Sequence, residues 1–197
     1  MKRPPVPTLV ILAIILGFCF VRANQVASPI KGAEHVTYKE VDGCKLILNA
    51  YFPQGHKRHK DQVPAVVFFF GGGWNGGSPS QFAPHCEYLA SRGMVAMTAD
   101  YRVKSRQGTT PFDCVEDGKS AIRYVRQHAK ELGVDPKRIA AGGGSAGGHV
   151  AAATGTVRGM DEKNEDSGIS SKPNALLLFN PVYDNGPKGY GYDRVQG

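Results

Sequence analysis

Short apolar runs alternate with helix-like segments along this chain, and this order restricts the possible folds more than any other feature. Pro64 to Phe70 (PAVVFFF) is continuously apolar and rich in β-branched and aromatic residues, which is typical of a strand buried on both faces. Met94 to Thr98 and Asn174 to Phe179 are predicted to be further buried strands. Because helix-like segments separate them, the sequence predicts an α/β fold with a mostly parallel sheet and helices on both faces.

The start of the domain differs from this pattern. Val36 to Val41 and Lys45 to Phe52 are strand-like, and Asp42-Gly43 joins them. Asp-Gly tolerates the positive φ angles of a tight hairpin turn. The sequence therefore predicts an N-terminal antiparallel hairpin.

Two helices are predicted between the buried strands. Pro79 to Ser91 forms the first, which Gly93 ends. Thr110 and Pro111 are suitable as N-cap and first residue of the second, longer helix, which ends at Gly133. Apolar or small residues of the long helix recur every three or four positions and form one stripe for packing on the sheet: Val115, Gly118, Ile122, Val125, Ala129 and Leu132.

A serine surrounded by glycines is the first candidate for chemistry. Arg138 to Ala141 is a short predicted strand, His149 to Thr154 continues as a helix, and Gly143 to Gly147 between them matches GxSxG. Glycines flank the serine in this motif because the turn between strand and helix is too tight for side chains. We therefore predict Ser145 as a nucleophile, with the amide of Ala146 as an oxyanion donor at the start of a helix.

A second glycine-rich segment follows the strand that ends at Phe70. Gly71, Gly72 and Gly73 come directly after it and precede Trp74. Consecutive glycines let backbone amides face a substrate carbonyl oxygen, as in the oxyanion loop of lipases and esterases. We predict Gly71 and Gly72 as the other oxyanion donors.

With Asp100-Tyr101-Arg102 and Asp135 to Ile139 (DPKRI), these motifs stand in an order that resembles the α/β-hydrolase superfamily. Within it, the chain is similar to the hormone-sensitive-lipase-like and feruloyl-esterase-like carboxylesterases. The resemblance implies an α/β-hydrolase fold and hydrolysis of carboxylic esters through an acyl-enzyme at Ser145. Phe70 stands where the family usually has a histidine that braces the oxyanion loop.

The resemblance also implies a triad acid and a triad histidine, each after a later strand. His149 is the only histidine after Ser145, and it lies in the nucleophile's own helix, where we expect it to pack or hydrogen bond. Asp184 is a weak candidate for the acid. We expect the chain to lack the last strand–helix units and to be inactive by itself, as a fragment, a truncated gene model or a decayed, non-catalytic homologue. A peptidase of the same fold is a further alternative.

The N-terminus reads as a secretory signal peptide over residues 1–23. A basic start is followed by a 13-residue apolar run from Leu9 to Val21, and small residues suit cleavage after Ala23. The run is short for a membrane span, which needs about 20 residues, so an uncleaved anchor is the weaker interpretation. We expect a secreted or periplasmic protein, with residues 24–197 as one incomplete hydrolase domain.

Charge and cysteine content exclude several other classes. The net charge of +7 falls to +4 without the leader, and the basic run from His56 to Lys60 is expected to be a solvated loop rather than a nucleic-acid site. Cys44, Cys86 and Cys114 are expected to be buried free thiols, and no metal or cofactor is expected. The expected partner is a small-molecule or carbohydrate-linked ester, with membrane contact only through an uncleaved leader; the oligomeric state stays open.

The glycines around Ser145 also allow a second interpretation. Gly142, Gly144 and Gly147 also spell GxGxxG, but a dinucleotide fingerprint belongs to the first βα turn of its domain, so this alternative is disfavoured. The polar stretch from Gly159 to Pro173 is predicted to be a mobile connection.

Overall fold

The computed structural model describes residues 30–196. The signal peptide predicted over residues 1–23 lies outside this part of the chain. Within residues 30–196, every helix is too short or too polar to cross a membrane.

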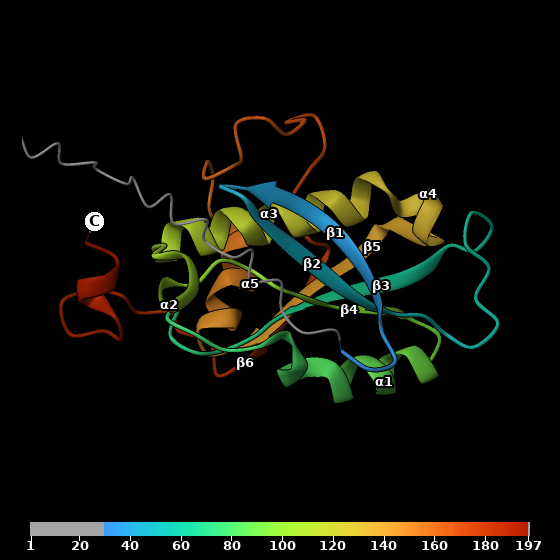
Figure 1. Cartoon of the computed structure of the whole chain (residues 1–197), viewed down its shortest axis with the longest axis horizontal. Coiled ribbons are helices and arrows are strands. Elements are labelled where there is room, and N and C mark those ends of the chain that lie inside the picture. The colour runs from blue at the N-terminus through green and yellow to red at the C-terminus, as the bar shows by residue number, and fades with distance from the viewer. Residues whose placement is uncertain (1–29, 197) are drawn as a thin grey trace, which may run out of the picture.

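One six-stranded mixed sheet forms the centre of the molecule, in the order β1-β2-β4-β3-β5-β6 (Figure 1). β1 pairs antiparallel with β2, and β2 pairs antiparallel with β4; the remaining neighbours are parallel. This confirms the predicted α/β-hydrolase type of sheet with an N-terminal hairpin. The strands are β1 Glu34–Val41, β2 Cys44–Tyr51, β3 Val63–Phe69, β4 Val95–Ala99, β5 Val134–Gly144 and β6 Ala175–Phe179.

Helices cover both faces of the sheet, as predicted. α1 lies on one face, and α3 and α5 lie on the other (Figure 1). Alternate residues of β3 enter the two cores: Val67 and Phe69 face α3 and α5, whereas Val66 and Phe68 face α1. The helical elements are η1 Pro79–Phe82, α1 Ala83–Ser91, α2 Lys104–Gln107, α3 Pro111–Gln127, α4 Ala129–Leu132, α5 Ala146–Thr156 and η2 Tyr192–Arg194.

The helices depart from prediction in three places. The first begins with the 3₁₀ turn η1 before α1. The long helix ends at Gln127, and His128 separates it from α4. The carbonyl oxygen of Tyr124 lies 2.9 Å from the ring Nδ1 of His128 and also accepts a hydrogen bond from the backbone amide of His128. The short helix α2 was not predicted. The predicted packing stripe of the long helix is nevertheless buried along its whole length.

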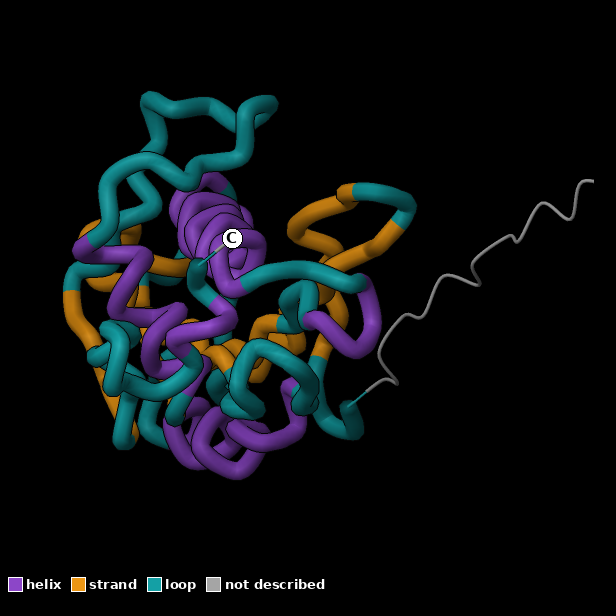
Figure 2. The backbone as a smooth tube through the Cα atoms, turned by 90° about the vertical axis from the view of Figure 1, so that its left-hand side faces the viewer, coloured by secondary structure: helices purple, strands orange, loops and turns teal. Residues whose placement is uncertain are grey.

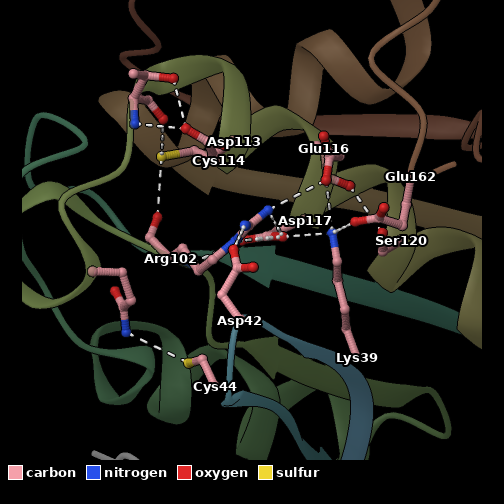
Figure 3. A network of polar contacts seen from close by, with 12 residues as sticks. Lys39, Asp42, Cys44, Arg102, Asp113, Cys114, Glu116, Asp117, Ser120 and Glu162 are labelled. Atoms are coloured by element: carbon pink, nitrogen blue, oxygen red, sulfur yellow. Dashed lines mark hydrogen bonds and ion pairs between the residues drawn. The ribbon is translucent and has the colours of Figure 1, made fainter. Parts of the chain in front are cut away.

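A buried ionic network ties the hairpin to the helix layer (Figure 3). Asp117 of α3 is fully buried, and its carboxylate accepts hydrogen bonds from Nε and Nη2 of Arg102 and from Nζ of Lys39. Arg102 belongs to the Asp-Tyr-Arg motif after β4, and Lys39 belongs to β1. Asp117 of α3 therefore joins Lys39 of β1 to the arginine of the motif after β4.

The polar connection between α5 and β6 is held by ion pairs, in contrast to the mobile connection that its composition predicted. Arg123 of α3 binds both Asp161 and Glu165, and Lys39 binds Glu162 at 2.9 Å. Lys119 adds a contact with Asp161 at 3.2 Å. The acidic residues of the connection find their partners on α3 and β1, which local sequence does not reveal.

β6 is only partly covered, although its sequence predicts a strand buried on both faces. It forms one edge of the sheet and pairs only with β5 among the described strands. Leu176, Leu177 and Phe179 expose 40%, 39% and 46% of their surface. The composition of a strand indicates the environment that it suits, and the described residues cover β6 only in part, with Leu178 packed against the core.

The three described cysteines are free thiols, as predicted. Cys86 and Cys114 are buried, and burial raises the pKa of each thiol well above its usual value. Cys44 is only half-buried, contrary to prediction.

Candidate active site

Ser145 lies on the sharp turn that its glycine neighbours predicted. β5 ends at Gly144 and α5 begins at Ala146, so one residue connects strand and helix. Its backbone angles are φ 53° and ψ −121°, a conformation that L-residues seldom adopt. The turn also sits close to other backbone: a Cβ on Gly147 would lie 2.1 Å from the carbonyl oxygen of Phe69. Only glycine fits there.

The turn is anchored to β6. The amide of Ser145 donates to the carbonyl oxygen of Phe179 at 3.0 Å, and the amide of Val182 donates to the carbonyl oxygen of Ser145 at 3.2 Å. These bonds place the residues after β6 beside the serine.

The segment from Gly71 to Trp74 runs alongside the serine. A Cβ on Gly71 would lie 3.4 Å from Cβ of Ser145. Gly72 has φ +141°, and a Cβ there would lie 2.2 Å from the carbonyl oxygen of Gly76. The sequence places glycines here because the loop folds tightly against itself and against the turn at Ser145.

The three amides predicted as oxyanion donors differ in their surroundings. The amide of Gly71 donates to Oε1 of Gln81 at 2.6 Å. The amides of Gly72 and Ala146 have no acceptor among residues 30–196. Gly72 and Ala146 thus offer unpaired donors, whereas Gly71 is already paired.

Phe70 contacts a tyrosine of another motif. Its ring stacks on that of Tyr101, with 4.1 Å between centroids and 17° between planes. Tyr101 Oη also donates to the carbonyl oxygen of Phe70 at 2.6 Å. Tyr101 is fully buried, and its burial raises the pKa of the phenol well above its usual value, so the hydroxyl keeps its proton as a donor. The motif after β4 therefore supports the start of the loop.

A pocket of about 470 Å³ opens beside Ser145. Gly71, Gly72 and Gln81 line it, together with Phe179 at the end of β6 and Asn180 directly after it. Phe82 and His85 supply aromatic surface, with ring centroids 5.1 Å apart. The pocket combines an apolar wall with unpaired backbone donors near one hydroxyl, which suits a small ester.

The described histidines do not hydrogen bond to Ser145. The ring of His149 packs edge-on against that of Trp74, with 5.1 Å between ring centroids, and burial lowers the pKa of the His149 imidazole. His149 is therefore packed, as its place in the helix of Ser145 predicted. Sequence reasoning overlooked His85, which lines the pocket from α1, because the family's order places the base after the serine. Within residues 30–196, the Oγ of Ser145 makes no hydrogen bond.

Asp184, the weak candidate for the acid, closes a turn. Its Oδ1 accepts from the amide of Gly186 at 2.8 Å. The segment that follows folds back over the glycine loop, where Arg194 donates to the carbonyl oxygen of Gly73 and Tyr190 faces Trp74 with 6.0 Å between centroids. Figure 2 views the molecule from the side on which this segment lies.

Comparison with known proteins gives related esterases. The solved structure of apo Thermogutta terrifontis esterase 2 is 52% identical with a TM-score of 0.82, over 87% of this chain and 66% of that one. An AB hydrolase superfamily protein of Schizosaccharomyces pombe is 37% identical over 62% of this chain and 34% of its own length. Carboxylesterase NlhH of Mycobacterium tuberculosis is 35% identical over 47% of this chain and 29% of its own. The chain thus spans about a third of these curated relatives and less than two thirds of the solved esterase.

The BD-FAE family model matches residues 48–183, which include β3, the glycine loop, the turn at Ser145 and β6. The match agrees with the sheet order and with the esterase structures that superpose on this chain. This chain therefore belongs to the BD-FAE family and has the α/β-hydrolase fold of carboxylesterases.

Proposed function

We propose that this chain supplies the nucleophile and the oxyanion hole of a serine hydrolase that cleaves small carboxylic esters. The strongest support is the position of Ser145, on a one-residue turn beside a pocket and two unpaired amides. Ser145 Oγ attacks the ester carbonyl carbon, and a base removes its proton. The carbonyl oxygen becomes an oxyanion, the alcohol leaves with a proton from the base, and water then releases the acid from the acyl-enzyme.

The amides of Gly72 and Ala146 are the donors best placed for the oxyanion. Gly71 was predicted as a third donor, but its amide would first have to leave Gln81. The first turn of α5 adds positive potential at Ser145 because its amides point toward the serine. The charge that develops on the substrate oxygen thus meets donors that are already oriented.

The pocket and the relatives both support a proposal for the substrate class. Phe82, His85 and Phe179 give the pocket an apolar side suited to a short acyl or aryl group. Structures of Thermogutta terrifontis esterase 2 carry the descriptions propionate-bound and butyrate-bound. We propose esters of short carboxylic acids, including acids linked to carbohydrate, as substrates of the complete enzyme.

We further propose that these 197 residues alone turn esters over negligibly, because within residues 30–196 no histidine hydrogen bonds to the Oγ of Ser145, and His149 packs against Trp74. Export to the periplasm or the outside of the cell, guided by residues 1–23, remains part of the proposal.

Hydrolysis of p-nitrophenyl acetate and p-nitrophenyl butyrate tests this. The purified chain and its Ser145→Ala variant should give equal rates, both close to the rate of the uncatalysed reaction. Turnover by the chain that exceeds the variant's rate would show that a base is present within it, with His85 as the first residue to replace.

A further inference from the structure

The peptide group between Phe70 and Gly71 is held by side chains on both of its sides. Its carbonyl oxygen accepts from Tyr101 Oη at 2.6 Å, and its N–H donates to Oε1 of Gln81 at 2.6 Å. Because a peptide group is planar, bonds at its oxygen and at its nitrogen together fix its rotation about the chain.

The two side chains come from different parts of the fold. Tyr101 follows β4 and is fully buried, whereas Gln81 lies on η1 and is exposed. The stacked ring of Phe70 adds a third restraint, since a Cβ on Gly77 would lie 2.5 Å from that ring. The start of the glycine loop is therefore restrained at the carbonyl oxygen of Phe70 by Tyr101 and at the amide of Gly71 by Gln81.

The Phe70–Gly71 peptide group directly precedes the amide of Gly72, which is a proposed oxyanion donor. The Gly72 amide belongs to the next peptide group, which is joined to this one at the α-carbon of Gly71. Rotation of the Phe70–Gly71 peptide changes φ of Gly71 and therefore shifts the Gly72 amide, unless ψ of Gly71 changes to compensate. The neighbouring serine is close, with only 3.4 Å between its Cβ and a Cβ position on Gly71. A small rotation would thus separate the Gly72 amide from an oxyanion on a substrate bound to Ser145.

We propose that Gln81 and Tyr101 are positioning residues, which clamp the Phe70–Gly71 peptide so that the amides of Gly72 and Ala146 converge on the substrate oxygen. In this arrangement the Gly71 amide is a fixed point of the loop and is not an oxyanion donor. The inference rests on the proposed function and refines it, because it assigns a task to two residues that do not touch the reacting atoms.

The clamp can be tested on the 197-residue chain without turnover, by NMR of ¹⁵N-labelled protein. Hydrogen exchange of the Gly71 amide measures the bond to Gln81. Titration with butyrate, the acid product expected under the proposed function, measures the oxyanion hole through the Gly72 and Ala146 resonances. In the wild-type chain we expect a protected Gly71 amide that butyrate leaves paired, and saturable shifts at Gly72 and Ala146.

Gln81→Met removes the acceptor but keeps the length of the side chain. We expect exchange at Gly71 to accelerate about tenfold and the butyrate Kd to rise about fivefold, in line with the loss of one hydrogen bond. Gln81→Glu restores an acceptor and should restore protection at Gly71. Tyr101→Phe keeps the ring stack and removes the donor, and should also weaken butyrate binding. Glu87→Gln on α1 is the control, and thermal unfolding of each variant shows whether the fold is retained.

The outcomes separate the clamp from the proposed function. If butyrate shifts Gly72 and Ala146 in wild-type protein but Gln81→Met binds it equally well, the clamp is wrong and the proposed function stands. If butyrate shifts Gly71 strongly, Gln81 is a displaceable plug and the clamp is again wrong. If butyrate affects none of these amides in the wild type, the proposed function is contradicted, and Gly71 exchange in Gln81→Met still decides whether the clamp exists.

Discussion

At the scale of single residues, Ser145 has a backbone conformation that opposes folding. A non-glycine residue at φ 53° and ψ −121° costs on the order of 1–3 kcal/mol. The turn is nevertheless imposed by close backbone packing: a Cβ on Gly143 would lie 2.5 Å from the carbonyl group of Gly147, and one on Gly147 would lie 2.1 Å from the carbonyl oxygen of Phe69. Ser145 is exposed at this turn, as the proposed role of a nucleophile requires.

Replacement of Ser145 by glycine should therefore raise the free energy of unfolding, whereas replacement by alanine should not. Ser145→Gly relieves the strain, and although glycine adds disorder to the unfolded chain, we expect a net gain of about 1 kcal/mol in the free energy of unfolding. Ser145→Ala keeps the strain and should match the wild type. Urea denaturation followed by circular dichroism measures both, and a glycine variant less stable than the alanine variant would show that the turn is not strained.

At the scale of elements, the connection between α5 and β6 depends on carboxylates. The hydrogen bond from Glu116 and the contact with Lys39 lower the pKa of Glu162 to about 2, and bonds from Arg123 and Lys119 outweigh burial to lower that of Asp161. A carboxylate whose pKa is lower in the folded than in the unfolded state stabilises the fold fully at pH values above its unfolded-state pKa. This stabilisation is lost as the pH falls to the folded-state pKa. Burial raises the pKa of Glu116, whose contribution has the opposite sign.

The connection should therefore loosen on acidification. We expect protection factors of amides in residues 159–170 to fall as pH decreases from about 4.5 toward about 2, the interval between the usual and the folded-state pKa of Glu162. At pH 7, Glu162→Gln should speed trypsin cleavage after Lys163 relative to the wild type. Asp166→Asn is the matched control, since among residues 30–196 the side chain of Asp166 bonds only to the amide of Gly168, within the connection. Equal cleavage of both variants would contradict a role for the Lys39–Glu162 pair.

Prediction from sequence succeeded where the signal is local. The Asp42-Gly43 hairpin, β3 and the packing stripe of the long helix follow from periodicity and turn chemistry, and the glycines around Ser145 follow from the tightness of that turn. It failed for contacts between distant segments. Nothing near Gly71 indicates that Gln81 takes its amide, and nothing near Ser145 indicates that His85 lines the same pocket. The ion pairs of the polar connection were missed for the same reason.

At the scale of the whole molecule, β6 leaves an apolar edge. Unpaired strand edges with large apolar side chains promote association between chains. The exposed residues are Leu176, Leu177 and Phe179.

We expect this chain to associate as its concentration rises, through β6. Sedimentation velocity should show larger species at higher concentration, and Leu177→Lys should shift the distribution toward monomer because a charged edge resists pairing. Tyr88→Lys, at an α1 residue with 65% of its surface exposed, is the control and should leave association unchanged. A chain that stays monomeric at all concentrations would show that the edge is protected.

Covalent labelling tests most directly whether Ser145 is the nucleophile of an esterase. The resemblance to the family implies that the acid and the base follow later strands, so the protein to label is a fusion of residues 24–183 with the complementary C-terminal part of Thermogutta terrifontis esterase 2. A structure of that enzyme is described as phosphonylated by sarin. The same fusion with Ser145→Ala serves as control, and circular dichroism establishes that both are folded.

After reaction with a fluorophosphonate probe and digestion with trypsin, mass spectrometry locates the adduct. Residues 139–158 form one tryptic peptide, and Ser145 is its only serine. We expect the adduct on this peptide in the fusion and its absence in the Ser145→Ala control. A folded fusion that carries no adduct, or carries it on another peptide, would contradict the assignment of Ser145 as the nucleophile.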